Sequence, residues 1–85
     1  MSDVIAVFRS KTETYRFMEY MRKSGATCVI VTTPSNARVG CGVSAKFNYA
    51  KLNYAYKIVR VGGFTAFKGF YLISKKGSVT SVSKI

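Results

Sequence analysis

Cys41 is the residue whose type and setting best fit chemistry in this chain. It stands between Gly40 and Gly42 in a loop, residues 34–42, that separates two apolar runs. Glycine on both sides leaves a thiol little shielded and allows backbone conformations that other residues resist. A nearby cation favours the reactive thiolate, and Arg38 of the same loop is placed to supply one. The pattern predicts either a reactive thiol or a small residue in a tight turn.

The remaining side chains exclude most enzyme mechanisms. The chain has no histidine and three carboxylates, Asp3, Glu13 and Glu19. Cys-His and Ser-His-Asp catalysis within the chain are therefore excluded, and catalysis by a carboxylate pair is disfavoured. The two cysteines, Cys28 and Cys41, have neither the spacing of a thioredoxin-type pair nor that of a zinc site. We expect a protein that is not an enzyme and that uses no cofactor and no metal ion.

Cys28 lies in an apolar run beside Val29 and Ile30. A free cysteine in such a run packs as a small hydrophobic residue, so we expect a buried and unreactive thiol. A redox pair with Cys41 is the alternative, and it requires Cα atoms within about 7 Å of each other.

The charge is strongly asymmetric along the chain. The net charge is +11, and no acidic residue follows Glu19. Such a field attracts polyanions or an acidic protein partner, whereas the simpler interpretation is a set of solvated lysines. The start of the chain has no signal-peptide pattern, and no apolar run approaches the roughly 20 residues that span a bilayer. We expect a cytoplasmic protein that does not associate with a membrane.

Periodicity and capping residues predict alternating strands and helices in one domain, residues 1–85. Ser10 and Glu13 have the spacing of a capping box, in which each side chain satisfies a backbone donor at a helix start, and Gly25 is suited to end that helix. Helical spacing predicts that one face of this helix carries Thr14, Phe17, Met18 and Met21. Pro34 ends the second strand, because proline cannot donate to a strand ladder. The predicted strands are 4–8, 27–33, 43–47 and 67–74, the predicted helices are 11–24 and 49–61, and residues 78–83 either form a further edge strand or fray.

This β-α-β-β-α-β order predicts the α+β class and a ferredoxin-like βαββαβ two-layer sandwich. Both helices would cover one face of an antiparallel sheet, with or without an extra C-terminal edge strand. Because this fold supports many functions, it does not by itself identify one.

Three features of the chain resemble the selenium/sulfur carrier-like family of small bacterial domains. The first strand ends in Phe8-Arg9-Ser10, Gly25 closes the first helix, and Pro34 is followed seven residues later by Cys41-Gly42. The resemblance covers about the first 60 positions, and the spacing from proline to Cys-Gly is its strongest element.

The chain departs from the family pattern within the loop. Ser35 and Asn36 stand where the family usually has arginine and glutamate, and Arg38 replaces a small polar residue. The strong positive charge is also unusual for the family. The resemblance therefore carries over the cysteine and its setting, but not the electrostatics or the identity of the partners.

The resemblance implies a carrier that holds sulfur or selenium on Cys41 as a persulfide or selenosulfide. Its partners would be a donor protein and an acceptor protein. Arg38 is the first candidate to stabilise the thiolate, and Arg9 is the second if the end of the first strand lies beside the loop. Backbone amides around Gly40 and Gly42 would form a small anion nest, and Pro34 would set the direction in which the loop leaves the strand.

A basic nucleic-acid-binding or protein-interaction module without chemistry is the alternative. RNA-recognition domains share the predicted topology and stack bases on aromatic residues of the open sheet face. If Val43, Ala45 and Phe47 face the helices, the third strand offers only Ser44 and Lys46 to that face. We therefore expect non-specific attraction to phosphates, with a steep dependence on salt, and no readout of sequence.

Overall fold

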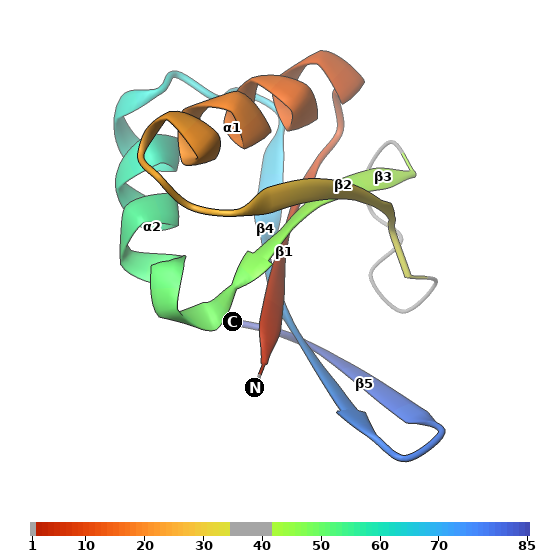
Figure 1. The fold of residues 1–85 in the computed structure, drawn as a ribbon. Helices are drawn as coiled ribbons and strands as arrows, with labels where there is room; N and C mark the ends of the chain where they lie inside the picture. Colours follow the sequence, from red (N-terminus) through yellow and green to blue (C-terminus); the bar gives the residue numbers. More distant parts are fainter. Residues whose placement is uncertain (1, 35–41) are drawn as a thin grey trace.

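The computed structural model describes residues 2–34 and 42–85. They form an α+β domain in the predicted order of elements (Figure 1). The elements are β1 (Asp3–Phe8), α1 (Lys11–Lys23), β2 (Cys28–Thr32), β3 (Val43–Asn48), the short 3-10 helix η2 (Tyr49–Lys51), α2 (Leu52–Val61), β4 (Phe67–Lys76) and β5 (Val79–Lys84). The segment predicted as one helix over 49–61 therefore begins as a 3-10 turn, in which Asn48 Oδ1 accepts a hydrogen bond from the amide of Ala50 at 2.9 Å.

The five strands form one antiparallel sheet in the order β2-β3-β1-β4-β5. β1 lies at its centre, where Ile5 pairs with Lys46 of β3 on one side and with Tyr71 of β4 on the other. The C-terminal segment, for which an edge strand and fraying were both open, forms the edge strand β5 along β4.

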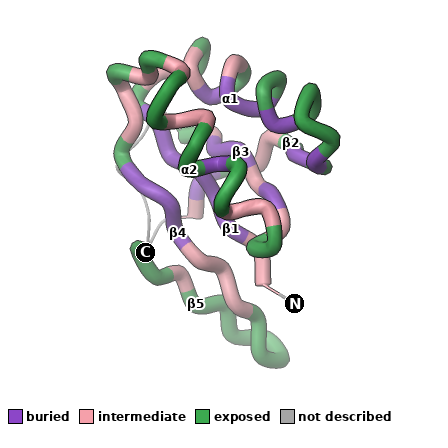
Figure 2. The backbone as a smooth tube through the Cα atoms, turned by 90° about the vertical axis from the view of Figure 1, so that its left-hand side faces the viewer, coloured by how far each residue is buried: buried purple, intermediate pink, exposed green. Residues whose placement is uncertain are grey.

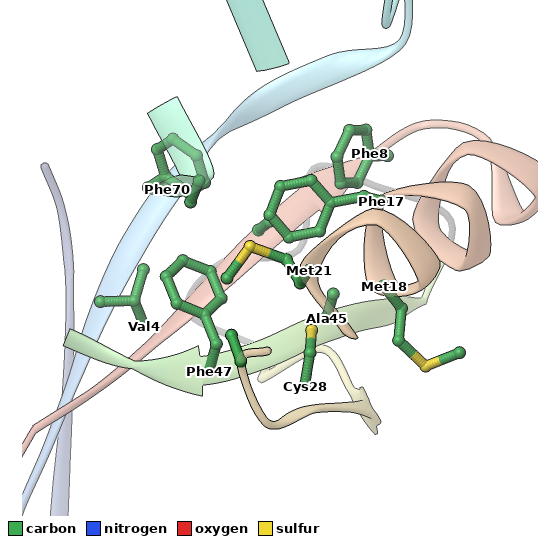
Figure 3. Packing of buried hydrophobic residues seen from close by; sticks show 12 residues of the cluster. Val4, Phe8, Phe17, Met18, Met21, Cys28, Ala45, Phe47 and Phe70 are labelled. Atoms are coloured by element: carbon green, nitrogen blue, oxygen red, sulfur yellow. The ribbon is translucent and has the colours of Figure 1, made fainter. Parts of the chain in front are cut away.

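The main core lies between the two helices and one face of the sheet. Val4, Ala6 and Phe8 of β1 pack there with residues of both helices, and Phe8 contacts Phe17 of α1 at 5.4 Å between ring centroids (Figure 3). The buried face of α1 is the predicted one, consisting of Thr14, Phe17, Met18 and Met21. Helical periodicity was therefore sufficient to identify this face.

No helix of the described residues lies on the other face of the sheet, yet the centre of that face is also buried. Ile5 and Val7 are 0% exposed and form a second cluster with Tyr71. In Figure 2 the central strands are largely buried, whereas most of β5 and the outer side of α2 are exposed. A central strand with both faces covered explains why residues 4–8 form a continuous apolar run without alternation.

The ends of α1 are built by local hydrogen bonds. Ser10 Oγ accepts from the amide of Glu13 at 3.2 Å, as the capping box predicts. At the other end, Gly25 has a φ of +90°, and the amides of Gly25 and Ala26 donate to the carbonyls of Arg22 and Met21. This is the Schellman arrangement, which needs a residue that tolerates a left-handed backbone.

The part of the capping-box prediction that concerns the Glu13 side chain is wrong. Its carboxylate was expected to return to the amide of Ser10, but it reaches across the domain to the segment before β4. There it accepts hydrogen bonds from the amide and hydroxyl of Thr65 and from the amide of Ala66, at 2.9 to 3.1 Å.

Among the described residues, no helix is long and apolar enough to cross a membrane.

Candidate functional site at the base of the cysteine loop

Cys41, Arg38 and Gly40 lie outside the described residues. The structure places the two residues that bound them, Pro34 and Gly42, at the end of the β2–β3 hairpin. Arg9, the other predicted site residue, is also described. The site can therefore be built from the base of the loop.

The base of the loop is closed by one backbone and one side-chain hydrogen bond. Thr33 N donates to the carbonyl of Gly42 at 2.9 Å, which extends the hairpin beyond the last ladder pair, Thr32 and Val43. The hydroxyl oxygens of Thr33 and Ser44 lie 2.6 Å apart, and both residues are buried. Buried hydroxyls that satisfy each other hold a hairpin end in one geometry.

Sequence reasoning missed this hydroxyl pair. Alternation in 43–47 placed Ser44 on the solvent side of a half-buried strand, whereas it is 0% exposed. Ser44 pairs with Val7 of the central strand, so it lies within the sheet and away from its rim. The available signal was Thr33, a further hydroxyl immediately before the strand-ending proline.

Gly42 leaves the loop with a φ of +96°, in the left-handed region. A Cβ atom added there would meet nothing within 4 Å, so space does not require glycine at this position. The backbone conformation does, because residues with a side chain rarely adopt it. The glycine on this side of Cys41 thus serves the turn of the backbone.

Arg9 lies at the same end of the sheet as Pro34 and Gly42. Val7 pairs with Ser44, so Arg9, two residues further along, leaves β1 where β3 begins. Its amide donates to the carbonyl of Ala66 at 2.8 Å, while the residue itself is exposed. At the level of the backbone, the first strand therefore ends at the same end of the sheet as Pro34 and Gly42, and the role of Arg9 beside the thiol stays a prediction.

Cys28 is a buried free thiol at the other end of the hairpin. It is 1% exposed and pairs with Phe47, four residues or about 13 Å along the strand from Thr32. Burial raises the pKa of Cys28 to about 11, against the opposing effect of Arg22, whose Nε donates to the Cys28 carbonyl at 3.0 Å. The predicted burial of Cys28 is confirmed.

A comparison with protein-family models matches residues 3–71 to the family described as "Putative Se/S carrier protein-like". The chain belongs to this family. The match covers the whole cysteine loop, from Pro34 to Gly42, and the helix that Gly25 closes, so the resemblance stated from the sequence is confirmed. No curated protein and no solved structure matches the chain.

β5 lies beyond the residues that match the family. Val82 packs against the cluster formed by Ile5, Val7 and Tyr71. A Cβ atom built on Gly69 would lie 2.9 Å from Cε of Lys84, so the stem of this lysine crosses β4 at a position without a side chain. The last strand therefore covers part of the face that has no helices.

That face offers no stacking surface for bases among its described residues. Ala45 and Phe47 point to the helices, as expected. Tyr71 is the aromatic residue of the other face, and it is only 8% exposed. Among the residues described, no group of three or more cysteine or carboxylate side chains is placed to hold a metal ion.

Proposed function

We propose that this domain carries sulfur or selenium on Cys41 between a donor protein and an acceptor protein. The Cys41 thiolate attacks the outer, sulfane sulfur of a donor persulfide. The sulfur–sulfur bond of the donor breaks, the donor leaves as a thiolate, and the transferred sulfur remains on Cys41 as a persulfide. With a selenosulfide donor, selenium is transferred in the same way, and neither transfer needs an external oxidant or reductant.

Membership of the carrier-like family over residues 3–71 is the observation that supports this proposal most strongly. The chain has two cysteines, and Cys28 is buried with a raised pKa. A thiol in that setting is a poor nucleophile, because the thiolate is the reactive form. Cys41, between two glycines, is therefore the thiol to which we assign the chemistry.

The neighbours of Cys41 receive supporting roles in this proposal. Arg38 and then Arg9 supply positive charge that favours the thiolate, and amides around Gly40 and Gly42 receive the negative charge. Pro34 sets the direction of the loop.

We further propose that the protein is a ferredoxin-like domain, that it works in the cytoplasm, and that it is a carrier and not an enzyme. The strand order, with β1 between β3 and β4, supports a single ferredoxin-like domain. The free thiol of Cys28 fits the reducing cytoplasm, where cysteines stay reduced. The protein would act as a carrier and not as an enzyme, since each molecule takes up and releases one atom.

The test is the mass of the intact protein after incubation with a small-molecule persulfide donor. Wild type and Cys28→Ser should gain the mass of one sulfur atom, and Cys41→Ser should gain none. The adduct should map to Cys41 after digestion and should pass to an acceptor thiol. Absence of the adduct in wild type, or equal labelling of Cys28, would exclude the carrier mechanism.

Arg9 can be tested in the same assay through the pH dependence of loading. Arg9→Gln should shift the pH profile of loading to higher pH, because a cation that favours the thiolate has been removed. Arg60→Gln on α2 is the matched control, since it removes the same charge from the helix layer. Identical profiles for the two variants would show that Arg9 has no such role.

Non-specific binding of nucleic acid is the second candidate function. The net charge of +11 favours it, because phosphate neutralisation by lysine and arginine provides affinity without sequence readout.

A further inference from the structure

A groove of about 320 Å³ crosses the face of the sheet that carries no helices and ends at the base of the cysteine loop. Residues of four strands and the start of the loop contribute to its lining. They include Asp3 of β1, Val31 of β2, Lys46 of β3, Ile73 and Lys75 of β4, and Pro34.

The apolar part of the groove is held in place by the packing beneath it. Val31 and Ile73 are only partly buried, and both pack against the cluster of Ile5, Val7 and Tyr71. Since Ile5 and Val7 are 0% exposed, this layer is closed, and the groove has a floor of fixed shape.

Two lysines border this floor. Lys46 Nζ lies 3.9 Å from Asp3 Oδ2, and the two side chains remain 39% and 44% exposed. Such an exposed pair is worth little, so Lys46 remains free to interact with an incoming carboxylate. Lys75 is exposed on the same side of the sheet, opposite Thr80 of β5.

We propose that this groove binds an acidic polypeptide segment. Carboxylates of the segment would pair with Lys46 and Lys75, and its apolar side chains would cover Val31 and Ile73. The net charge of +11 would steer such a segment towards the surface. Because Pro34 lines the groove and begins the loop 34–42, the bound segment would lie against the base of that loop.

The protein that contains this acidic segment can be inferred from the proposed function, on which this step rests. A carrier must meet a donor and an acceptor, and either protein has to bring its reacting group to Cys41. A docking groove that ends at the base of the loop would align that partner. We therefore assign the acidic segment to a protein that exchanges sulfur or selenium with this chain.

The groove fits a polypeptide better than a nucleic acid. Its floor is aliphatic, and Tyr71, the aromatic residue on this face among those described, is 8% exposed. Recognition of single-stranded nucleic acid relies on exposed aromatic rings on which bases stack. Asp3, which also lines the groove, can accept a hydrogen bond from a peptide amide.

The test uses three labelled probes with the full chain, both as wild type and as Cys41→Ser. The first is a short peptide of glutamate and leucine in equal numbers, the second is a polyglutamate peptide of the same length, and the third is a single-stranded DNA oligonucleotide. Binding is measured by fluorescence anisotropy. The contact surface of the first peptide is mapped by amide chemical shifts, which should change for Val31, Lys46, Ile73 and Lys75.

Two double variants separate the groove from general charge. Lys46→Gln with Lys75→Gln alters the groove, and Lys57→Gln with Arg60→Gln alters α2, and each pair lowers the net charge from +11 to +9. The groove pair should weaken binding of the glutamate–leucine peptide by about 3- to 10-fold, as expected for two exposed ion pairs, and the α2 pair should leave it within about twofold. Thermal unfolding of both variants checks that each is folded.

Four outcomes would contradict the proposal. The first is that neither peptide binds, the second is an equal loss of binding in both double variants, and the third is binding of the oligonucleotide alone in the groove. Tighter binding of polyglutamate than of the mixed peptide would contradict the apolar floor. Since peptide binding does not need the thiol, failure of the groove and failure of persulfide loading on Cys41 are separate results.

Discussion

Cys28 has an ordinary side chain whose reactivity is suppressed by its place in the core. Its carbonyl is held by Arg22, its strand neighbours are apolar, and it is 1% exposed. Burial disfavours the charged thiolate, so the pKa of Cys28 rises from its ordinary value of 9.0 to about 11. Under the proposed function, this protection of Cys28 leaves the chemistry to Cys41.

Cys28 should react slowly as long as the domain is folded. In the Cys41→Ser variant, a thiol reagent at neutral pH should modify Cys28 about 100-fold more slowly than in urea, since a rise of two pKa units lowers the thiolate fraction by that factor. The measurement is the rate of colour release by a disulfide reagent, with and without urea. Rates within a factor of about ten would show that Cys28 is accessible in the folded domain.

At the scale of elements, Glu13 joins α1 to the start of β4. Its carboxylate accepts hydrogen bonds from Thr65 and Ala66 on a segment more than 50 residues away in the sequence. Partial desolvation raises the pKa of Glu13, but the hydrogen bonds from Ala66 and Thr65, with the nearby Arg16, outweigh it, and the net pKa is lowered. The charged form therefore stabilises the folded state.

Glu13→Gln should destabilise the domain at neutral pH and lose this effect in acid. A carboxyl whose pKa is lower in the folded state contributes stability above its unfolded pKa, and the contribution is lost as the pH falls through the folded pKa. The difference between wild type and variant in urea unfolding should therefore be full at pH 7 and shrink below the ordinary value of 4.5.

Glu19→Gln is the matched control for this experiment. It removes the same charge from the same helix at an exposed position. Its unfolding free energy should follow that of wild type closely at all pH values. A difference for Glu13→Gln that does not change with pH would show that the hydrogen bonds act without the help of the charge.

At the scale of the whole molecule, positive charge is distributed over both layers. Lys57 and Arg60 lie on α2, Lys46 and Lys75 lie on the sheet face without helices, and the total is +11. Such a distribution attracts polyanions from all sides. Binding at a specific site must therefore be distinguished from this general electrostatic attraction.

Binding of single-stranded DNA should therefore be weak, independent of sequence and steeply dependent on salt. Between about 50 and 200 mM salt, the affinity should fall at least about tenfold, because several counterions are released per complex. Anisotropy with two oligonucleotides of different sequence measures this. The groove and α2 double variants should weaken DNA binding equally. Sequence preference, or affinity that persists in high salt, would contradict this background role.

Several features of this protein could be predicted from short stretches of its sequence. Periodicity identified the buried face of α1, and Gly25 marked its end. Three short sequence features, of which the spacing from Pro34 to Cys41-Gly42 is the strongest, led to the correct family. These signals depend on residues that are neighbours along the chain, whose geometry is set by the backbone alone. Strand order and register decided the rest, because they bring together residues that are distant in the sequence.

Three features belong to that second group. Glu13 binds Thr65 in place of Ser10, the hydroxyls of Thr33 and Ser44 meet inside the hairpin, and Arg9 leaves β1 at the end of the sheet where the loop begins. Alternation along one strand cannot show that both faces of a central strand are buried, nor that a groove forms between side chains of four strands. The sequence determined which residues could carry a function, and only the tertiary structure decided which of them share a surface.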